Sequence, residues 1–402
     1  MVNYKEIENY KPKILCFTSF YYPGFKGGGP IRTITNFVEY FWSKYDIYIV
    51  CLDRDLLDTQ PYKSVKIDSW NKIGKANIFY ASKKTINLKG IYKLLNERSY
   101  NALYLNSFFS FWFSIVPFLL NFFCFSLPKP CIIAPRGEFS NEALKLKNYK
   151  KKLYINFFYF LNLHLKLFWQ ASSEFEKKDI IRQFGRDTKK IFIAPDLVFP
   201  KLKIKNEFRK RSKGPLRMVF LSRISPMKNL DFLLRVLRQV KISVQLFIYG
   251  PKDDTVYWRK CIYLKNLLPS NIKVIIEDEV PQNKVQKILK DYDLLILPTR
   301  GENFGHIIIE SLIAGVPVLI SNRTLWKSDR GGAIECLPLI QKIWMKAIIK
   351  WGKLDDKKLN SKRKAAFKFA QKYLQNQSIL KKNEYFFNFI LKKSKVDNTY
   401  EI

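Results

Sequence analysis

Short apolar runs alternate with helix-like segments along most of the chain, and this alternation limits its fold more than any other feature. The first half contains "KILCFTSF", "DIYIVCL", "NALYL" and "CIIAP", and "PIRTITNFVEYF" repeats its apolar residues at helical spacing. The second half contains "MVFLSRIS", "VQLFIYG", "IKVIIED", "DLLILP" and "PVLIS". This pattern predicts an α/β fold in which parallel sheets carry helices on both faces.

The alternation is interrupted by a charged segment, "KLKIKNEFRKRSKGPLR", and this divides the chain in two. We expect two Rossmann-like, doubly wound domains, over residues 1–198 and 199–380, and a C-terminal helix and tail over 381–402 that can cross back to the first domain. A chain of 402 residues has room for two domains of ordinary size. Ligands of such sheets bind at the carboxyl ends of the strands, so we expect a central cleft.

The composition is strongly basic. Lys and Arg outnumber Asp and Glu by 71 to 34, which would suit nucleic acid, an anionic membrane surface or a phosphorylated ligand. The lysines are spread evenly among many Asn, Ile and Phe residues, a pattern that AT-rich coding also produces, and no nucleic-acid recognition motif is present. Scattered cysteines and the absence of an apolar signal core predict a cytoplasmic protein, and two histidines without a cysteine cluster argue against zinc.

Two aromatic segments are candidates for lipid contact. The uncharged run "FFSFWFSIVPFLLNFFCFSL" at 108–127 is long enough to span a bilayer, but it contains Pro117 and Asn121 and lies between two predicted strands. If those strands pair in parallel, the connection stays on one side of any membrane, so we favour a buried or membrane-touching helix. The segment "KKLYINFFYFLNLHLKLFW" is the second candidate. We expect a peripheral protein at the inner face of the plasma membrane.

The chemistry is concentrated after two strands of the second half. Arg223 and Lys228 follow "MVFLS", and "GENFGHIIIE" places a glycine-rich loop before a helix that starts near Gly305. A helix N-terminus beside Arg and Lys is an anion site suited to a diphosphate. Glu302 and Glu310 would be repelled by a diphosphate unless they hold hydroxyl groups, which points to a nucleotide sugar. The alternative is a solvated loop acid and an unrelated helix acid.

Two glutamates separated by seven residues resemble the motif of the retaining GT-B glycosyltransferases of family 4, the glycosyl transferases group 1. "SRISPMKN" is similar to the phosphate-binding segment of that family, "FYYPGFKGGGP" to its glycine loop, and "GENFGHIIIESLIAGVPVLISNRTLW" to members that build capsule, lipopolysaccharide and other surface polysaccharides. The resemblance implies a hexosyltransferase that takes a sugar from a UDP- or GDP-linked donor. It also implies a saccharide acceptor, which we expect to be lipid-linked, and no metal or other cofactor.

The resemblance assigns a role to each site residue. Arg223 and Lys228 would neutralise the leaving diphosphate, Glu302 would contact the donor sugar, and Glu310 would hold the ribose. The remaining donor-binding residues would be Asn303, Phe304, Gly305, His306, Gly28 and Gly29. Many members have a histidine in the first domain where this chain has "PRGEFSNEA", so we place Arg136 and Glu138 on the acceptor side.

Three alternatives compete with this interpretation. Asp53 and Asp55 in "CLDRDLLD" form an acid-x-acid pair of the kind that binds a metal and a nucleotide in the other glycosyltransferase architecture. Gly27 to Gly29 resemble part of a dinucleotide site, but the G-x-G-x-x-G spacing is absent. The third alternative is a non-enzymatic basic protein that binds membranes or nucleic acid through this fold.

Overall fold

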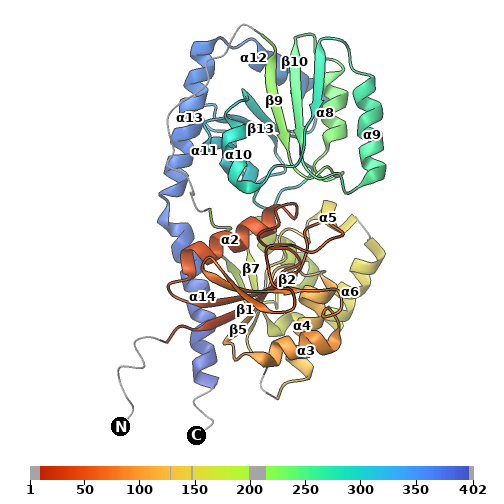
Figure 1. Cartoon of the computed structure of the whole chain (residues 1–402). Coiled ribbons are helices and arrows are strands. Elements are labelled where there is room, and N and C mark those ends of the chain that lie inside the picture. The colour runs from red at the N-terminus through yellow and green to blue at the C-terminus, as the bar shows by residue number, and fades with distance from the viewer. Residues whose placement is uncertain (1–9, 127, 146–147, 199–213, 398–402) are drawn as a thin grey trace. The chain divides into compact units, whose positions relative to one another are not determined.

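A computed structural model describes residues 10–126, 128–145, 148–198 and 214–397 (Figure 1). The chain divides into two compact units, one formed by Met1–Phe199 with Gln377–Ile402 and the other by Pro200–Asn376. The expected domain boundary at 199 lies beside the first division. The second division lies a few residues before the expected one at 381, and the C-terminal helix α14 (Gln377–Asp397) is part of the first unit. The acceptor and donor roles of the two domains stay predictions.

The first unit is built on an eight-stranded sheet with the strand order β3-β4-β2-β1-β5-β6-β7-β8. All neighbours pair in parallel except β3 and β4, which form an antiparallel hairpin. The strands are β1 (Lys13–Phe17), β2 (Asp46–Leu52), β3 (Trp70–Ile73), β4 (Ala76–Ala81), β5 (Ala102–Leu105), β6 (Cys131–Ile133), β7 (Leu167–Ala171) and β8 (Ile191–Ile193).

Helices cover both faces of this sheet. The helices are α2 (Gly29–Phe41), α3 (Leu88–Glu97), α4 (Val116–Phe123), α5 (Asn141–Lys145), α6 (Asn148–Phe160) and α7 (Glu174–Phe184), with a π-helical turn at Phe111–Ile115 and a 3₁₀ turn at Leu163–Lys166. On one face α2 and α14 share a core in which Phe37, Phe41 and Phe387 pack together. Burying one such side chain contributes about 1.5–3 kcal/mol, so α14 is held firmly to this unit.

The segment 108–127 lies largely in the opposite core. Phe108, Phe113 and Phe118 are buried there, while Phe111 and Phe123 are exposed. Strands β5 and β6 pair in parallel, which meets the condition set by the sequence, so the segment between them is a crossover connection within this unit. None of the helices that the structure describes has the length and apolar character needed to cross a bilayer. The buried alternative therefore holds for Phe108, Phe113 and Phe118, and contact of the exposed Phe111 and Phe123 with lipid stays a prediction.

The second lipid candidate also needs correction. Residues 167–169 form part of β7, whose side chains are all buried, and Leu163 and His164 are buried as well. A continuous apolar run is typical of a central parallel strand, and this explains why the segment resembled a lipid-binding sequence. Large exposed apolar side chains remain on α6 and at Leu161 and Leu165, which follow it.

The second unit has a six-stranded parallel sheet with the order β11-β10-β9-β12-β13-β14. Its strands are β9 (Leu216–Leu221), β10 (Val244–Tyr249), β11 (Ile272–Ile276), β12 (Leu294–Leu297), β13 (Val318–Ser321) and β14 (Ile334–Leu337). Its helices are α8 (Leu230–Leu237), α9 (Thr255–Asn266), α10 (Gln282–Leu289), α11 (His306–Ile313), α12 (Gln341–Gly352) and α13 (Asp356–Leu374). Because β9 and β12 are neighbours, the loops that follow them leave the sheet side by side.

Candidate functional site

The loop after β9 presents Arg223 at the carboxyl end of the second sheet. The Ser222 N–H donates to Tyr249 O (3.1 Å) and the Ile224 N–H donates to Pro251 O (2.8 Å), so this loop is tied to the loop after β10. Gly250 allows the two loops to lie this close together, because a Cβ atom at position 250 would stand only 1.9 Å from Ser222 O. Arg223 itself is exposed, and none of the described residues forms an ion pair with it. The backbone around Arg223 is therefore held at the sheet, while its side chain is exposed to solvent.

The loop that carries Lys228 is fastened to the loop after β12. The Arg300 N–H donates to Met227 O (2.8 Å), and the Asn229 side chain donates to Pro298 O (3.0 Å). Asn229 has a left-handed backbone (φ 61°), which turns the chain into α8, and its Oδ1 accepts from Arg300 Nε (3.1 Å). Sequence reasoning missed Asn229 and Arg300, although an Asn directly before a helical pattern is a recognised signal for such a turn.

These ties bring two of the predicted catalytic residues into contact. Lys228 Nζ lies 2.5 Å from Glu302 Oε2, and both side chains are largely buried. The Glu302 N–H also donates to Arg323 O (3.1 Å), which holds the loop against the end of β13. Without a ligand, the Lys228 ammonium and the Glu302 carboxylate therefore neutralise each other, and an anion that binds Lys228 must share it with Glu302.

Helix α11 begins beside this ion pair, as the sequence predicts. Gly305 precedes the helix with a left-handed backbone (φ 79°), and a Cβ atom there would meet Glu302 Cγ at 2.9 Å. Phe304 is buried, and its carbonyl accepts from Trp326 Nε1 (2.6 Å), while its ring packs on His306. These contacts fix the start of α11, where the Ile308 N–H donates to Gly305 O (2.8 Å) and where the helix dipole favours an anion.

Glu310 and Asn303 complete the predicted donor set. Glu310 lies on α11, and every side chain of that helix is buried. Asn303 lies in the loop between Glu302 and the helix. The structure therefore gathers Lys228, Glu302, Gly305 and the start of α11 at one place, with Glu310 on the same short helix.

In the first unit the glycine loop, residues 18–28, connects β1 to α2. Gly28 has a left-handed backbone (φ 74°), and no atom lies within 4 Å of the position of a Cβ atom there. Gly29 is the first residue of α2, followed by Pro30, whose fixed φ suits a first helical turn. Gly28 thus lies at an open position where a ligand can approach the backbone closely, and Gly29 follows it directly.

Arg136 and Glu138, predicted on the acceptor side, have internal partners. Arg136 donates to Asn106 Oδ1 (2.7 Å) and to Tyr104 Oη, and forms an ion pair with Asp196. Glu138 accepts from Ser107 Oγ (2.7 Å) and from the N–H groups of Phe108 and Phe109 (2.6 and 3.2 Å). Burial raises the pKa of Glu138 and of Asp196, although these partners oppose the shift. Their contacts fit a structural role, so a contact with acceptor stays a prediction.

The acid pair proposed as a metal site also has internal partners. Asp53 accepts from Arg54 Nε (2.7 Å) and Asp55 accepts from backbone N–H groups of the glycine loop. Within the described ranges, no group of three or more His, Cys, Asp or Glu could hold a metal ion. Hydrogen bonding thus accounts for both carboxylates.

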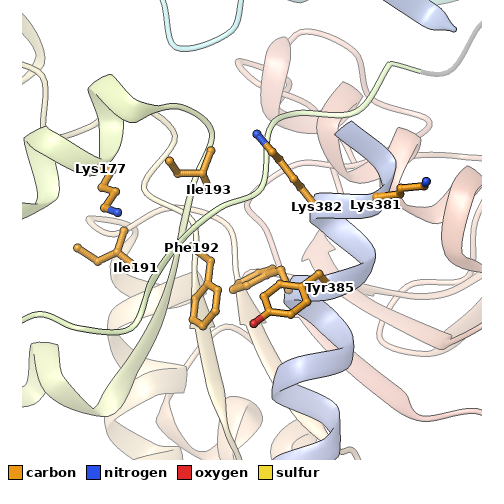
Figure 2. Close-up of a pocket in the computed structure, with 8 residues that line it drawn as sticks. Lys177, Ile191, Phe192, Ile193, Lys381, Lys382 and Tyr385 are labelled. Atoms are coloured by element: carbon orange, nitrogen blue, oxygen red, sulfur yellow. The ribbon is translucent and has the colours of Figure 1, made fainter. Parts of the chain in front are cut away.

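A hollow of 460 Å³ lies beside the edge strand β8 (Figure 2). The hollow is lined by strand β8, helix α7 and helix α14. The residues are Ile191, Phe192 and Ile193 of β8, Lys177 of α7, and Lys381, Lys382, Tyr385 and Phe386 of α14. None of these is a predicted site residue. The hollow is therefore separate from the residues assembled above.

Comparisons with known proteins agree with the geometry of the second unit. Residues 203–326 match the family described as "Glycosyl transferases group 1". An uncharacterized glycosyltransferase of Methanocaldococcus jannaschii, MJ1607, is 26% identical over 107 residues, which is 26% of this chain and 27% of that protein. An uncharacterized 41.2 kDa protein in the cps region of Klebsiella pneumoniae is 27% identical over 111 residues, 27% of this chain and 28% of that protein. These matches span about a quarter of the length of the curated relatives.

The whole fold resembles that of solved glycosyltransferases. The crystal structure of Anabaena Alr3699/HepE in complex with UDP-glucose superimposes with a TM-score of 0.66 at 14% identity, over 94% of this chain and 99% of that chain. At this identity the likeness shows the fold, which is two Rossmann-like units as the sequence predicts. Residues 203–326 are thus similar to the group 1 glycosyl transferases, and the whole chain has a fold of two Rossmann-like units like that of the GT-B enzymes.

Proposed function

We propose that the protein transfers a sugar from a nucleoside diphosphate sugar to a saccharide acceptor with retention of configuration. The observation that carries the proposal is the Lys228–Glu302 pair at the start of α11, beside a loop that presents an exposed Arg223. Two cations and a helix N-terminus suit a diphosphate, and a carboxylate next to them suits a sugar hydroxyl. A UDP-linked hexose is the donor class we favour, since a protein of the same fold binds UDP-glucose.

The proposed mechanism uses electrostatic stabilisation. The bond between the anomeric carbon and the diphosphate oxygen breaks, the acceptor hydroxyl attacks from the same face, and its proton passes to the departing phosphate oxygen. Arg223, Lys228 and the first N–H groups of α11 meet the negative charge that develops on the diphosphate. Glu302 contacts the sugar, Glu310 holds the ribose, and Asn303, Phe304 and His306 shape the donor site. Gly28 and Gly29 let the backbone of the first unit approach the substrate.

The acceptor we propose is a lipid-linked saccharide of a surface polysaccharide. The relative in a cps region favours polysaccharide biosynthesis, and the exposed face of α6 favours a membrane. Tyr149 and Phe160 are 81% and 83% exposed, Leu153 and Phe157 are exposed as well, and Lys150 and Lys152 lie on the same helix. The sequence from 143 to 173 contains no acidic residue, so this surface suits an anionic bilayer. We therefore propose a peripheral location at the inner face of the plasma membrane.

A donor screen tests the proposal. We expect calorimetric titration with UDP-, GDP- and ADP-sugars to find one that binds, and the corresponding nucleoside diphosphate to compete with it. The matching transfer assay, run with and without excess EDTA, should show activity in both. Absence of binding by every nucleotide sugar would overturn the proposal, and a strict requirement for Mn²⁺ or Mg²⁺ would favour a metal-dependent enzyme.

A further inference from the structure

We propose that Asp55 is a positioning residue that clamps the glycine loop of the first unit. This inference rests on the proposed function, because the contact between this loop and the substrate is part of that proposal. The sequence offered Asp55 as a metal ligand, but its surroundings in the structure indicate a different role.

The Asp55 carboxylate is a buried acceptor for the loop. Its Oδ2 accepts from the N–H groups of Phe25 (2.6 Å) and Lys26 (3.0 Å), and its Oδ1 accepts from the Leu56 N–H (2.8 Å). Only 3% of Asp55 is exposed, so water has little access to these donors. The carboxylate thus joins the segment after β2 to the segment after β1 through charge-assisted hydrogen bonds, which are the stronger kind.

Other contacts close the same clamp. Tyr80 Oη donates to Tyr22 O (2.6 Å). Lys26 Nζ also pairs with Asp58 Oδ1 (2.7 Å), but this pair is partly exposed to solvent and adds little to the clamp. Gly24 lies so close that a Cβ atom would stand 2.9 Å from Asp55 Cγ and 2.3 Å from Tyr62 Oη. A side chain at position 24 would therefore displace Asp55 or Tyr62 from the position it has in the clamp.

The clamp decides which backbone groups a ligand can use. Because Asp55 occupies the N–H groups of Phe25 and Lys26, an incoming phosphate or hydroxyl cannot take them. The open part of the loop is Gly28, whose surroundings leave space, and the start of α2 that follows it. Asp55 thereby holds the loop in a conformation that leaves Gly28 open.

Asp55→Asn is the appropriate variant because it preserves shape. An Asn side chain has one accepting oxygen, whereas the Asp55 carboxylate has two. The NH₂ group of Asn would therefore face a backbone N–H donor, and at least one hydrogen bond to the backbone would be lost. Asp58→Asn is the matched control. Asp58 is exposed and pairs with Lys26 of the same loop, so this variant also removes one carboxylate charge beside the loop. Gly24→Ala is the second variant, because it disturbs the contact from the side of the loop.

Hydrogen exchange and kinetics are the two measurements. In Asp55→Asn we expect the amides of residues 20–28 to exchange about tenfold faster or more, from the loss of a charge-assisted hydrogen bond, while the 216–221 strand of the second unit is unchanged. In the transfer assay we expect kcat to fall about tenfold with nucleoside diphosphate affinity within twofold of wild type, and Asp58→Asn to change neither. This split separates positioning from a general loss of structure. If Asp55→Asn does not fold, Gly24→Ala should give the same pattern.

Three results would overturn the inference. These are unchanged exchange of residues 20–28 in Asp55→Asn, faster exchange with unchanged kcat, and Mn²⁺ binding by the wild type that Asp55→Asn abolishes. The exchange measurement needs no substrate. If the protein transfers no sugar, the proposed function is refuted. The exchange measurement then still tests whether Asp55 holds the loop.

Discussion

The charged residues of the two units differ in what surrounds them. In the first unit Arg136 has Asp196, Tyr104 and Asn106 as partners, and Glu138 accepts three hydrogen bonds. In the second unit Arg223 is exposed without an ion pair among the described residues, and Lys228 and Glu302 pair with each other across two loops. Charges of the first kind maintain a structure, whereas charges of the second kind leave capacity for a ligand.

This difference explains why similar sequence signals deserve different interpretations. "PRGEFS" and "SRISPMKN" both place an Arg after a strand, yet only the second presents it to solvent. A buried ion that loses its partner is costly, while an exposed cation costs little to remove until a ligand needs it. Substitutions in the two units should therefore separate stability from binding.

The largest effect should come from Arg136→Ala. This change leaves Asp196 buried without its cation, and breaking a buried ion pair costs about 3–5 kcal/mol. Urea denaturation should show the loss, whereas Arg223→Ala should unfold near the wild-type midpoint. An Arg136→Ala variant of wild-type stability with impaired transfer would mean that Arg136 contacts substrate after all.

The next effect concerns the two glutamates. Glu302→Gln should lower kcat about 100-fold, corresponding to about 2.7 kcal/mol, because the proposed place of Glu302 is near the reacting carbon. The same change frees Lys228 from its ion pair, so the affinity for nucleoside diphosphate should stay equal or increase. Steady-state kinetics and calorimetry on one preparation measure both quantities.

Glu310→Gln provides the contrast. Its proposed partner, the ribose, does not react, so its loss should weaken donor binding in ground and transition states alike and appear mainly in KM. Normal kcat in Glu302→Gln, or normal donor affinity in Glu310→Gln, would mean that the spacing of the two acids is a coincidence and that their assigned roles are wrong.

Removal of either cation in the second unit should weaken diphosphate binding. Arg223→Ala and Lys228→Ala should each cost about 1.5–3 kcal/mol, the range of a charge-assisted hydrogen bond. Lys228→Ala also leaves Glu302 without its partner, so it should cost more stability than Arg223→Ala. Titration with the nucleoside diphosphate and urea denaturation check the two parts. Unchanged affinity in both variants would refute the phosphate site.

Much of the fold was predictable because apolar runs reveal parallel strands. The runs at β1, β2 and β9 to β13 were recognised, whereas the β3–β4 hairpin, β7 and β14 were missed. Gly74, in the two-residue turn of the hairpin, was an available signal. The continuous run at β7 could not be told from a lipid-binding segment by periodicity.

The contacts of the site were less predictable than its residues. The motif located Lys228 and Glu302, but their ion pair joins positions 74 apart and depends on β9 and β12 being neighbours in the sheet. The internal partners of Arg136 and Asp55 also lie far away along the chain, so a linear motif could not distinguish a structural charge from a ligand-binding one.

The smallest effect per residue should occur on α6, where the exposed surface of the first unit differs from that of the second. Lys150→Gln with Lys152→Gln should weaken binding to anionic vesicles by about 1 kcal/mol for each lysine, and high salt should reduce binding of the wild type. The exposed lysines Lys342 and Lys346 of α12 are the matched control, and their replacement by Gln should change nothing. Phe160→Ser should weaken binding in a salt-independent way, because it removes apolar contact with lipid. Equal losses in the α6 and α12 variants would mean that net charge alone drives binding, and the lipid-facing role of α6 would have to be abandoned.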